Sequence, residues 1–145
     1  MSDLHVLCKI ADAEYVLPAS DVLQMESFTG ATKVPGSDAH VAGLVQIRGR
    51  VVPVIDMRVV FGLPSITPTL DSRVVVMKRN ERTVGLLVDS AREVLKILAA
   101  DFQPPPSLLR QQTDGLVKAV VQVKERLLML IDFSKVLDEE HTNGQ

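Results

Sequence analysis

The chain has 145 residues, 46% of them hydrophobic and only 3% aromatic, with no tryptophan. Such a chain can bury the core of one compact domain or of two small lobes, built mainly from aliphatic side chains. Sixteen basic and eighteen acidic residues give a net charge of -2, which excludes the basic stripe typical of a nucleic-acid-binding protein.

Short apolar runs separated by turn-forming residues predict β-strands along most of the chain. In chain order the predicted strands are Leu4–Ile10, Glu14–Leu17, Val22–Phe28, Ala42–Ile47, Val51–Ile55, Arg73–Arg79, Thr83–Val88, Ala91–Leu98, Gly115–Val123 and Arg126–Ile131. Two short helices are predicted where an aspartate can cap free amides: Met57–Phe61 after Asp56, and Phe133–Leu137 after Asp132. This layout predicts an all-β barrel or sandwich.

Prolines and polar residues mark the segments outside the strands. Gly62–Leu70 and Gln103–Ser107 carry prolines that cannot donate to a sheet, so both are predicted connectors, and Asp138–Gln145 is a polar tail that we expect to fray. The runs Val51–Ile55 and Leu127–Ile131 are continuously apolar, which predicts that both of their faces are covered.

An internal repeat is visible in the sequence. Residues 43–57 align with 119–133 without a gap, so that Gln46, Arg50, Ile55 and Asp56 recur as Gln122, Arg126, Ile131 and Asp132. A looser match places residues 19–25 beside 88–94. Two hairpins and a short helix in each half predict two similar small β units.

The residues of a catalytic or metal centre do not gather in any recognisable motif. Cys8, the only cysteine, excludes an internal disulfide and reads as a buried strand residue. His5, His40 and His141 lack metal-ligand spacing, and the glycines form no phosphate-binding loop. Tyr15 and four phenylalanines are too few for the stacking platforms of a nucleic-acid-binding barrel. We therefore predict no enzyme, no metal, no cofactor and no nucleic acid.

The start of the chain bears on its location. Asp3, His5 and Lys9 interrupt the apolar stretch that a signal peptide would need. No apolar run approaches the roughly 18 residues of a membrane span. We therefore expect a cytoplasmic protein with no direct membrane insertion.

Three segments, in order, carry a resemblance to a known family. Val34–Pro35 followed by Val41–Arg58 resembles the central signature of CheW-like domains, with its V-x-G step, R-G pair and V-V-P-V-x-D stretch. Val84–Leu95 resembles the family's V-G-L-x-V-D-x-V-x-E-V-L segment, and Leu130–Phe133 also fits. The resemblance covers about residues 4–137. It implies a single domain over residues 1–137, made of two small, intertwined SH3-like five-stranded β-barrels with short helices, one of them near the C-terminus.

The same resemblance implies a function in signal transduction. CheW-like proteins are chemotaxis adaptors that couple a chemoreceptor to a CheA-type histidine kinase by protein–protein contacts. The implied partners are the regulatory domain of the kinase and the helical cytoplasmic tip of the receptor, at membrane receptor arrays. The alternative is a CheW-like accessory protein that binds a receptor without recruiting a kinase, or that serves a motility or pilus pathway.

Five residues are candidates for partner binding by this resemblance: Arg48, Gly43, Val22, Gln24 and Met25. Arg48 and Gly43 match positions at the coupling surface, and Val22 and Met25 match positions that line the receptor groove between the barrels. Gln24 departs from the glutamate that the family often has. Each also has a structural interpretation: a solvated turn charge for Arg48, close backbone packing for Gly43, and core packing for Val22 and Met25.

A second group of motif residues reads as structural. Gly49 provides positive φ in a tight turn, and Pro53 marks an edge or bulge position. Asp56 caps a helix and Asp89 fixes a turn, while Gly85 belongs to the second family motif.

Overall fold

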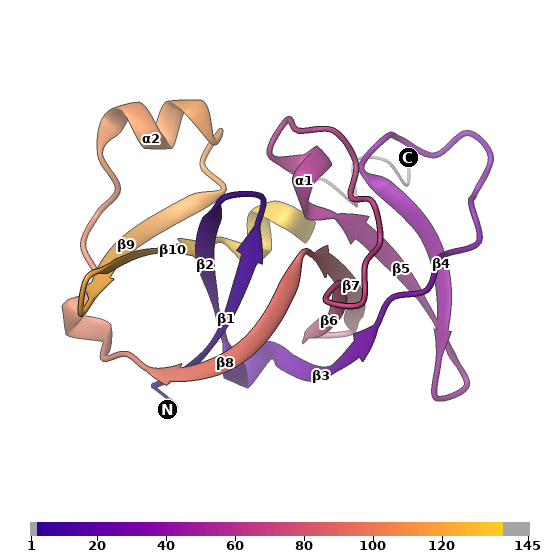
Figure 1. The fold of residues 1–145 in the computed structure, drawn as a ribbon, viewed down its shortest axis with the longest axis horizontal. Helices are drawn as coiled ribbons and strands as arrows, with labels where there is room; N and C mark the ends of the chain where they lie inside the picture. The colour runs from indigo at the N-terminus through magenta and orange to yellow at the C-terminus, as the bar shows by residue number, and fades with distance from the viewer. Residues whose placement is uncertain (1–2, 138–145) are drawn as a thin grey trace. The chain divides into compact units, whose positions relative to one another are not determined.

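The computed structural model describes residues 3–137, which form two compact units (Figure 1). Unit 1 combines the two ends of the chain, up to Ser20 and from Arg92 onward, and unit 2 is the segment Asp21–Ala91. The predicted polar tail, residues 138–145, lies outside the described residues. Within residues 3–137, no helix has the length and apolar character needed to cross a membrane.

Unit 1 is built on a five-stranded sheet with the order β8-β1-β2-β10-β9. The strands are β1 (Leu4–Ile10), β2 (Ala13–Pro18), β8 (Ser90–Lys96), β9 (Val117–Val123) and β10 (Arg126–Ile131). The 3₁₀ turn η2 (Ala99–Asp101) and helix α2 (Ser107–Gln112) connect β8 to β9, and residues 133–137 form a helical turn. The buried core of this unit includes a cluster made of Leu7, Val16, Ile97, Val121, Leu128 and Leu130.

Unit 2 has a five-stranded sheet with the order β3-β6-β7-β5-β4. Its strands are β3 (Val22–Ser27), β4 (Val41–Ile47), β5 (Arg50–Asp56), β6 (Arg73–Arg79) and β7 (Arg82–Val88). The 3₁₀ turn η1 (Ala19–Asp21) leads into β3, and helix α1 (Met57–Val60) follows β5. The buried core of this unit includes a cluster made of Val54, Ile66, Val74, Val76 and Leu87.

The two sheets repeat one arrangement of strands. Hairpins β6–β7 and β4–β5 of unit 2 correspond to β1–β2 and β9–β10 of unit 1, and the central parallel pair recurs as β5–β7 and β10–β2. Val54 pairs with Gly85 where Leu130 pairs with Val16, in agreement with both sequence alignments. The fold therefore contains the predicted repeat.

The units are not the two halves of the sequence, however. The first hairpin of each half pairs with the last three strands of the other half: β1–β2 joins β8, β9 and β10, and β6–β7 joins β3, β4 and β5 (Figure 1). Neither half contains a complete sheet, so each unit needs strands from both halves of the chain.

The predicted all-β class with two five-stranded units and short helices is confirmed. Each predicted strand is present within two residues of its expected ends, and both predicted helices form. Helix α2 was not predicted, because the prolines before it read only as a connector. Proline residues are compatible with the start of a helix, where backbone amides have no partner within the helix. Gln103, in the same connector, also pairs with Val120 at the sheet edge.

The prediction that both apolar runs are covered on both faces is wrong at one residue in each. Val51 and Leu127 occupy equivalent positions in the repeat, and each is 62% exposed. Both lie next to the hairpin turn, where the strand extends past the core. Cys8 fits its prediction: its side chain is buried, and burial raises the pKa of its thiol to about 12.

Candidate functional site

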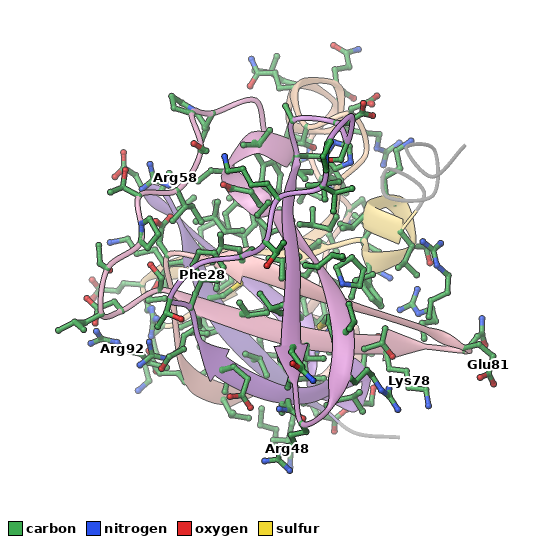
Figure 2. All side chains as sticks on the ribbon, turned by 90° about the vertical axis from the view of Figure 1, so that its right-hand side faces the viewer. Phe28, Arg48, Arg58, Lys78, Glu81 and Arg92 are labelled. Carbon is green, nitrogen blue, oxygen red and sulfur yellow. The ribbon has the colours of Figure 1, made fainter. Side chains whose placement is uncertain are left out.

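The turn between β4 and β5 holds Arg48 in a fixed position. Ile47 pairs with Arg50, so the loop consists of Arg48 and Gly49 alone, with φ angles of 52° and 78°. Two successive residues with positive φ form the hairpin turn that fits the twist of the flanking strands. The Arg48 side chain is exposed and has no hydrogen bond or ion pair within residues 3–137 (Figure 2). A rigid backbone thus presents a free guanidinium group.

Grooves of unit 2 meet around this turn. The edge groove, about 730 Å³, runs between the exposed edges of β3 and β4; it is lined by Val74 and by residues 26–32 and 44–48. The turn groove, about 300 Å³, is lined by Leu23, Gln24, Ile47, Arg48, Arg50, Val52, Val76 and Thr83. The hairpin groove, about 350 Å³, is lined by Arg50, Val51, Lys78, Glu81 and Thr83. Arg48 borders the first two, and Arg50 borders the last two.

Strand β3 lies at the edge of the sheet of unit 2 and carries the other three candidates for partner binding. Leu23 is 52% exposed and Met25 is 39% exposed, whereas Val22 and Gln24 are half-buried. The Gln24 amide donates a hydrogen bond to the Glu26 carboxylate. The structure therefore groups Met25 with Leu23, which the sequence did not single out, rather than with Val22.

Two glycines are required by close contacts. A Cβ at Gly43 would lie 2.4 Å from the backbone oxygen of Thr32, and Gly43 has a φ of 140°. It lies at a β-bulge beside the bridge between Thr32 and Leu44. A Cβ at Gly85 would lie 2.5 Å from Val74 Cγ1. Close backbone packing, one of the two interpretations of Gly43, therefore has a direct structural basis.

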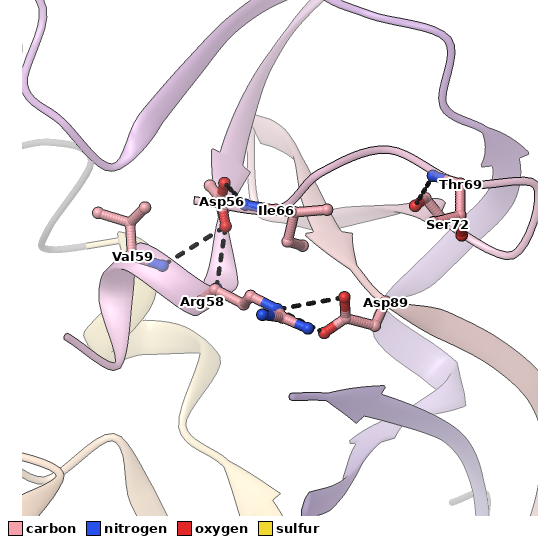
Figure 3. A network of polar contacts seen from close by, with 7 residues as sticks. All are labelled: Asp56, Arg58, Val59, Ile66, Thr69, Ser72 and Asp89. Carbon is pink, nitrogen blue, oxygen red and sulfur yellow. Dashed lines mark hydrogen bonds and ion pairs between the residues drawn. The ribbon is translucent and has the colours of Figure 1, made fainter. Parts of the chain in front are cut away.

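Asp56 ties α1 and the following connector to β5 (Figure 3). Its Oδ1 accepts hydrogen bonds from the amides of Arg58 and Val59, at 3.0 and 3.4 Å, and its Oδ2 accepts one from the amide of Ile66 at 2.9 Å. The predicted helix cap is confirmed. The contact with Ile66 was not predicted, and it anchors the proline-containing connector to the core.

Asp89 forms an ion pair rather than only fixing a turn. Arg58 Nε lies 2.9 Å from Asp89 Oδ2 and 3.2 Å from Oδ1 (Figure 3). This pair links the helix after β5 to the residue after β7. Pro53 was predicted at an edge or bulge, but β5 lies inside the sheet between β4 and β7. Pro53 is tolerated there because pairing with β7 begins only at Val54.

Cys8, Tyr15 and Glu14 of unit 1 have shifted pKa values. Burial raises the pKa of Tyr15 as it does that of Cys8, and a hydrogen bond from Arg126 lowers the pKa of Glu14. Within residues 3–137, no three His, Cys, Asp or Glu side chains are placed to hold a metal ion. The surface around Arg48 offers a free guanidinium group and exposed aliphatic side chains, which suit contact with another protein.

Comparison with known proteins identifies the family. A family model described as the CheW-like domain matches residues 5–141. The chain belongs to the CheW-like domain family. The chemotaxis protein CheW of Bacillus subtilis is 32% identical over 131 residues, covering 90% of this chain and 84% of that protein. CheW of Rhizobium meliloti is 27% identical, covering 91% and 85% of the two chains.

A solved structure agrees with this assignment. The scaffolding protein TtCheW from Thermoanaerobacter tengcongensis superposes with a TM-score of 0.82 and 26% identity, covering 91% of this chain and 90% of that chain. The chain is thus a chemotaxis adaptor of the CheW type, as the sequence motifs predicted. The family is one of scaffolds and adaptors rather than of enzymes.

Part of the surface was not predictable from the motifs. Leu23, Arg50, Lys78 and Thr83 join Arg48 around the turn and hairpin grooves, although they come from four strands. Their proximity depends on the β6–β7 hairpin pairing with β5 of the other half of the sequence. A repeat alignment alone does not reveal that exchange.

Proposed function

We propose that this chain couples a chemoreceptor to a CheA-type histidine kinase through two surfaces of unit 2. The turn at Arg48, with Gly43 shaping the strand behind it, would contact the regulatory domain of the kinase. Strand β3, through Met25 and its neighbours Val22 and Gln24, would contact the helical cytoplasmic tip of the receptor. The observation that supports this most is the free Arg48 guanidinium on a rigid two-residue turn.

Exposed apolar side chains and the Arg48 guanidinium would contribute differently to partner binding, the first to affinity and the second to specificity. Leu23 and Met25 on β3 and Val51 on β5 expose aliphatic surface that a partner would remove from water. Apolar contacts of this kind supply most of the affinity of protein interfaces, while an arginine with fixed geometry selects its partner. We propose that the adaptor works in the cytoplasm at membrane receptor arrays. Residues 1–137 would act as one domain, because each unit contains strands from both halves.

The test is co-sedimentation of the chain with receptor signalling tips and kinase, comparing wild type with Arg48→Glu. We expect wild type to bring the kinase down with the receptor, and Arg48→Glu to reduce the recruited kinase by about tenfold, because a misplaced charge at an interface costs a few kcal/mol. The matched control is Lys124→Glu. Lys124 occupies the equivalent turn of unit 1 and also has positive φ.

Each outcome decides a different point. Equal loss in Arg48→Glu and Lys124→Glu would mean that charge in general, rather than the Arg48 turn, controls recruitment. If wild type binds receptor tips and never recruits the kinase, the chain is an accessory receptor-binding protein and the coupling proposal is wrong.

A further inference from the structure

Unit 1 contains an arginine that is neutralised by two carboxylates. Arg126, on β10, donates to Glu14 on β2 through Nε at 3.1 Å and Nη2 at 2.7 Å. Arg126 Nη2 also lies 3.2 Å from Glu93 Oε1 on β8. Lys9 pairs with Glu14 across the β1–β2 hairpin. Two cations therefore surround Glu14, and the hydrogen bond from Arg126 holds the pKa of its carboxyl below the usual range.

Unit 2 has basic residues at the positions equivalent to Arg126 and Lys9, but no acidic residue at the positions equivalent to Glu14 and Glu93. The repeat aligns Arg50 with Arg126, and the two hairpin registers align Lys78 and Thr83 with Lys9 and Glu14. The looser repeat aligns Gln24 with Glu93. A neutral residue thus stands at each position where unit 1 has a carboxylate.

The side chains around Arg50 do not compensate for this difference. Arg50 is exposed, and its Nη1 makes one long hydrogen bond, 3.4 Å, to Thr83 Oγ1. The Gln24 amide is used by Glu26. Glu81 lines the hairpin groove beside Arg50 and Lys78, and within residues 3–137 it forms no ion pair with either.

We infer that Arg50 and Lys78 bind a carboxylate that a protein partner inserts into the hairpin groove, in the position that Glu14 occupies in unit 1. The planar guanidinium group favours a carboxylate, which it can bind with two parallel hydrogen bonds, as Arg126 binds Glu14. A polyanion such as nucleic acid fits less well, because Glu81 lines the same groove and the chain has a net charge of -2. That the partner is a chemotaxis protein rests on the proposed function.

The first test needs no chemotaxis partner. Hexaglutamate is titrated into the full chain while the Arg50 side-chain Nε–H signal is followed by NMR. We expect a saturable shift in wild type that is retained in Thr83→Gln and weakened about tenfold in Thr83→Glu, where an internal carboxylate occupies the site. Thr83→Glu should fold, since Glu14 occupies the matching position of unit 1, and its thermal unfolding midpoint is measured alongside.

Gln122→Glu is the control for general charge. It adds the same charge as Thr83→Glu, but on β9 of unit 1, at the exposed position that the repeat aligns with Gln46, and Gln122 lines none of the three grooves. We expect Gln122→Glu to bind hexaglutamate within about twofold of wild type. Equal binding by wild type and Thr83→Glu, or equal weakening by Gln122→Glu, would overturn the carboxylate site.

The second test uses receptor tips and kinase in the co-sedimentation assay, with the same variants. Loss of recruitment in Thr83→Glu, with Thr83→Gln and Gln122→Glu unchanged, is the expected result. If wild type binds hexaglutamate and recruits no kinase, the carboxylate site stands and the proposed function fails. If Thr83→Glu loses hexaglutamate binding and still recruits as wild type does, the site binds carboxylates but does not serve these partners, and that part of the inference is wrong.

Discussion

Unit 1 and unit 2 place an arginine at the same point of the same sheet, and the two residues have different surroundings. Arg126 is bound by Glu14 and Glu93, whereas Arg50 faces Thr83 and Gln24. The backbone pairing is the same in both, so the difference lies only in the side chains. In unit 1 the charges satisfy one another; in unit 2 they are available to another molecule.

The segments that follow the equivalent strands β8 and β3 also differ, and again unit 2 is the more open of the two. In unit 1, Ile97 is buried in the core and Phe102 packs against it and contacts the His5 ring at a centroid distance of 5.3 Å. In unit 2, Phe28 is only half-buried and small residues follow it, so the edge groove remains open beside β4. The comparison indicates that, when a fold contains the same unit twice, one unit can keep the filled core and the paired charges while the other provides a binding surface.

The largest effect that we expect on stability comes from making unit 2 resemble unit 1 at Gly43. Ala119 occupies the equivalent position, but a Cβ at Gly43 would lie 2.4 Å from a backbone oxygen at a φ of 140°. Gly43→Ala should therefore lower the free energy of unfolding by roughly 2–4 kcal/mol, measured by urea denaturation. The reverse change, Ala119→Gly, should cost only about 0.5–1 kcal/mol. The β9–β10 pairing also has a bulge next to Ala119, and equal costs would show that the two bulges have the same requirement for glycine.

A smaller effect should separate the two helix caps. Asp56 is 3% exposed, and its carboxylate accepts three backbone hydrogen bonds. Within residues 3–137, the Asp132 carboxylate accepts two, from the amides of Ser134 and Lys135. Asp56→Ala should cost about 2–3 kcal/mol of unfolding free energy, because the buried Ile66 amide loses its acceptor. Asp132→Ala should cost about 1 kcal/mol. Thermal denaturation gives both values, and faster hydrogen exchange at Ile66 in the first variant would identify the cause.

The smallest effect concerns the ion pair of unit 1 and its dependence on pH. Glu14→Gln should lower the free energy of unfolding by about 0.5–1 kcal/mol at pH 7, a modest value because both side chains are about one-third exposed. The hydrogen bond from Arg126 lowers the pKa of folded Glu14. The stabilisation is therefore present above the unfolded pKa of about 4.3 and is lost as pH falls through the lower folded value. Urea unfolding at pH 7 and pH 3 should show the difference between wild type and variant shrinking; a constant difference would mean that Glu14 stabilises the fold without its charge.

The local structure follows from the sequence to a large extent. Alternating apolar residues and turn-forming pairs determine the strands to within two residues, and Asp56 and Asp132 determine where short helices begin. Hairpin registers also follow, since a two-residue turn such as Arg48–Gly49 leaves one pairing. These features depend on residues close together in the chain, so local chemistry is enough to predict them. The family motifs then indicate the class of function.

Tertiary structure alone decided which residues share a surface. Arg50 and Thr83 meet because β5 pairs in parallel with β7, a strand of the other half of the sequence, and no local pattern encodes that choice. The same exchange places Glu14 beside Arg126 in unit 1 and Thr83 beside Arg50 in unit 2. Parallel pairing between distant strands is selected by burial of the whole core rather than by any turn. The sequence therefore determined the strands and the family, and the exchange of hairpins determined the surface.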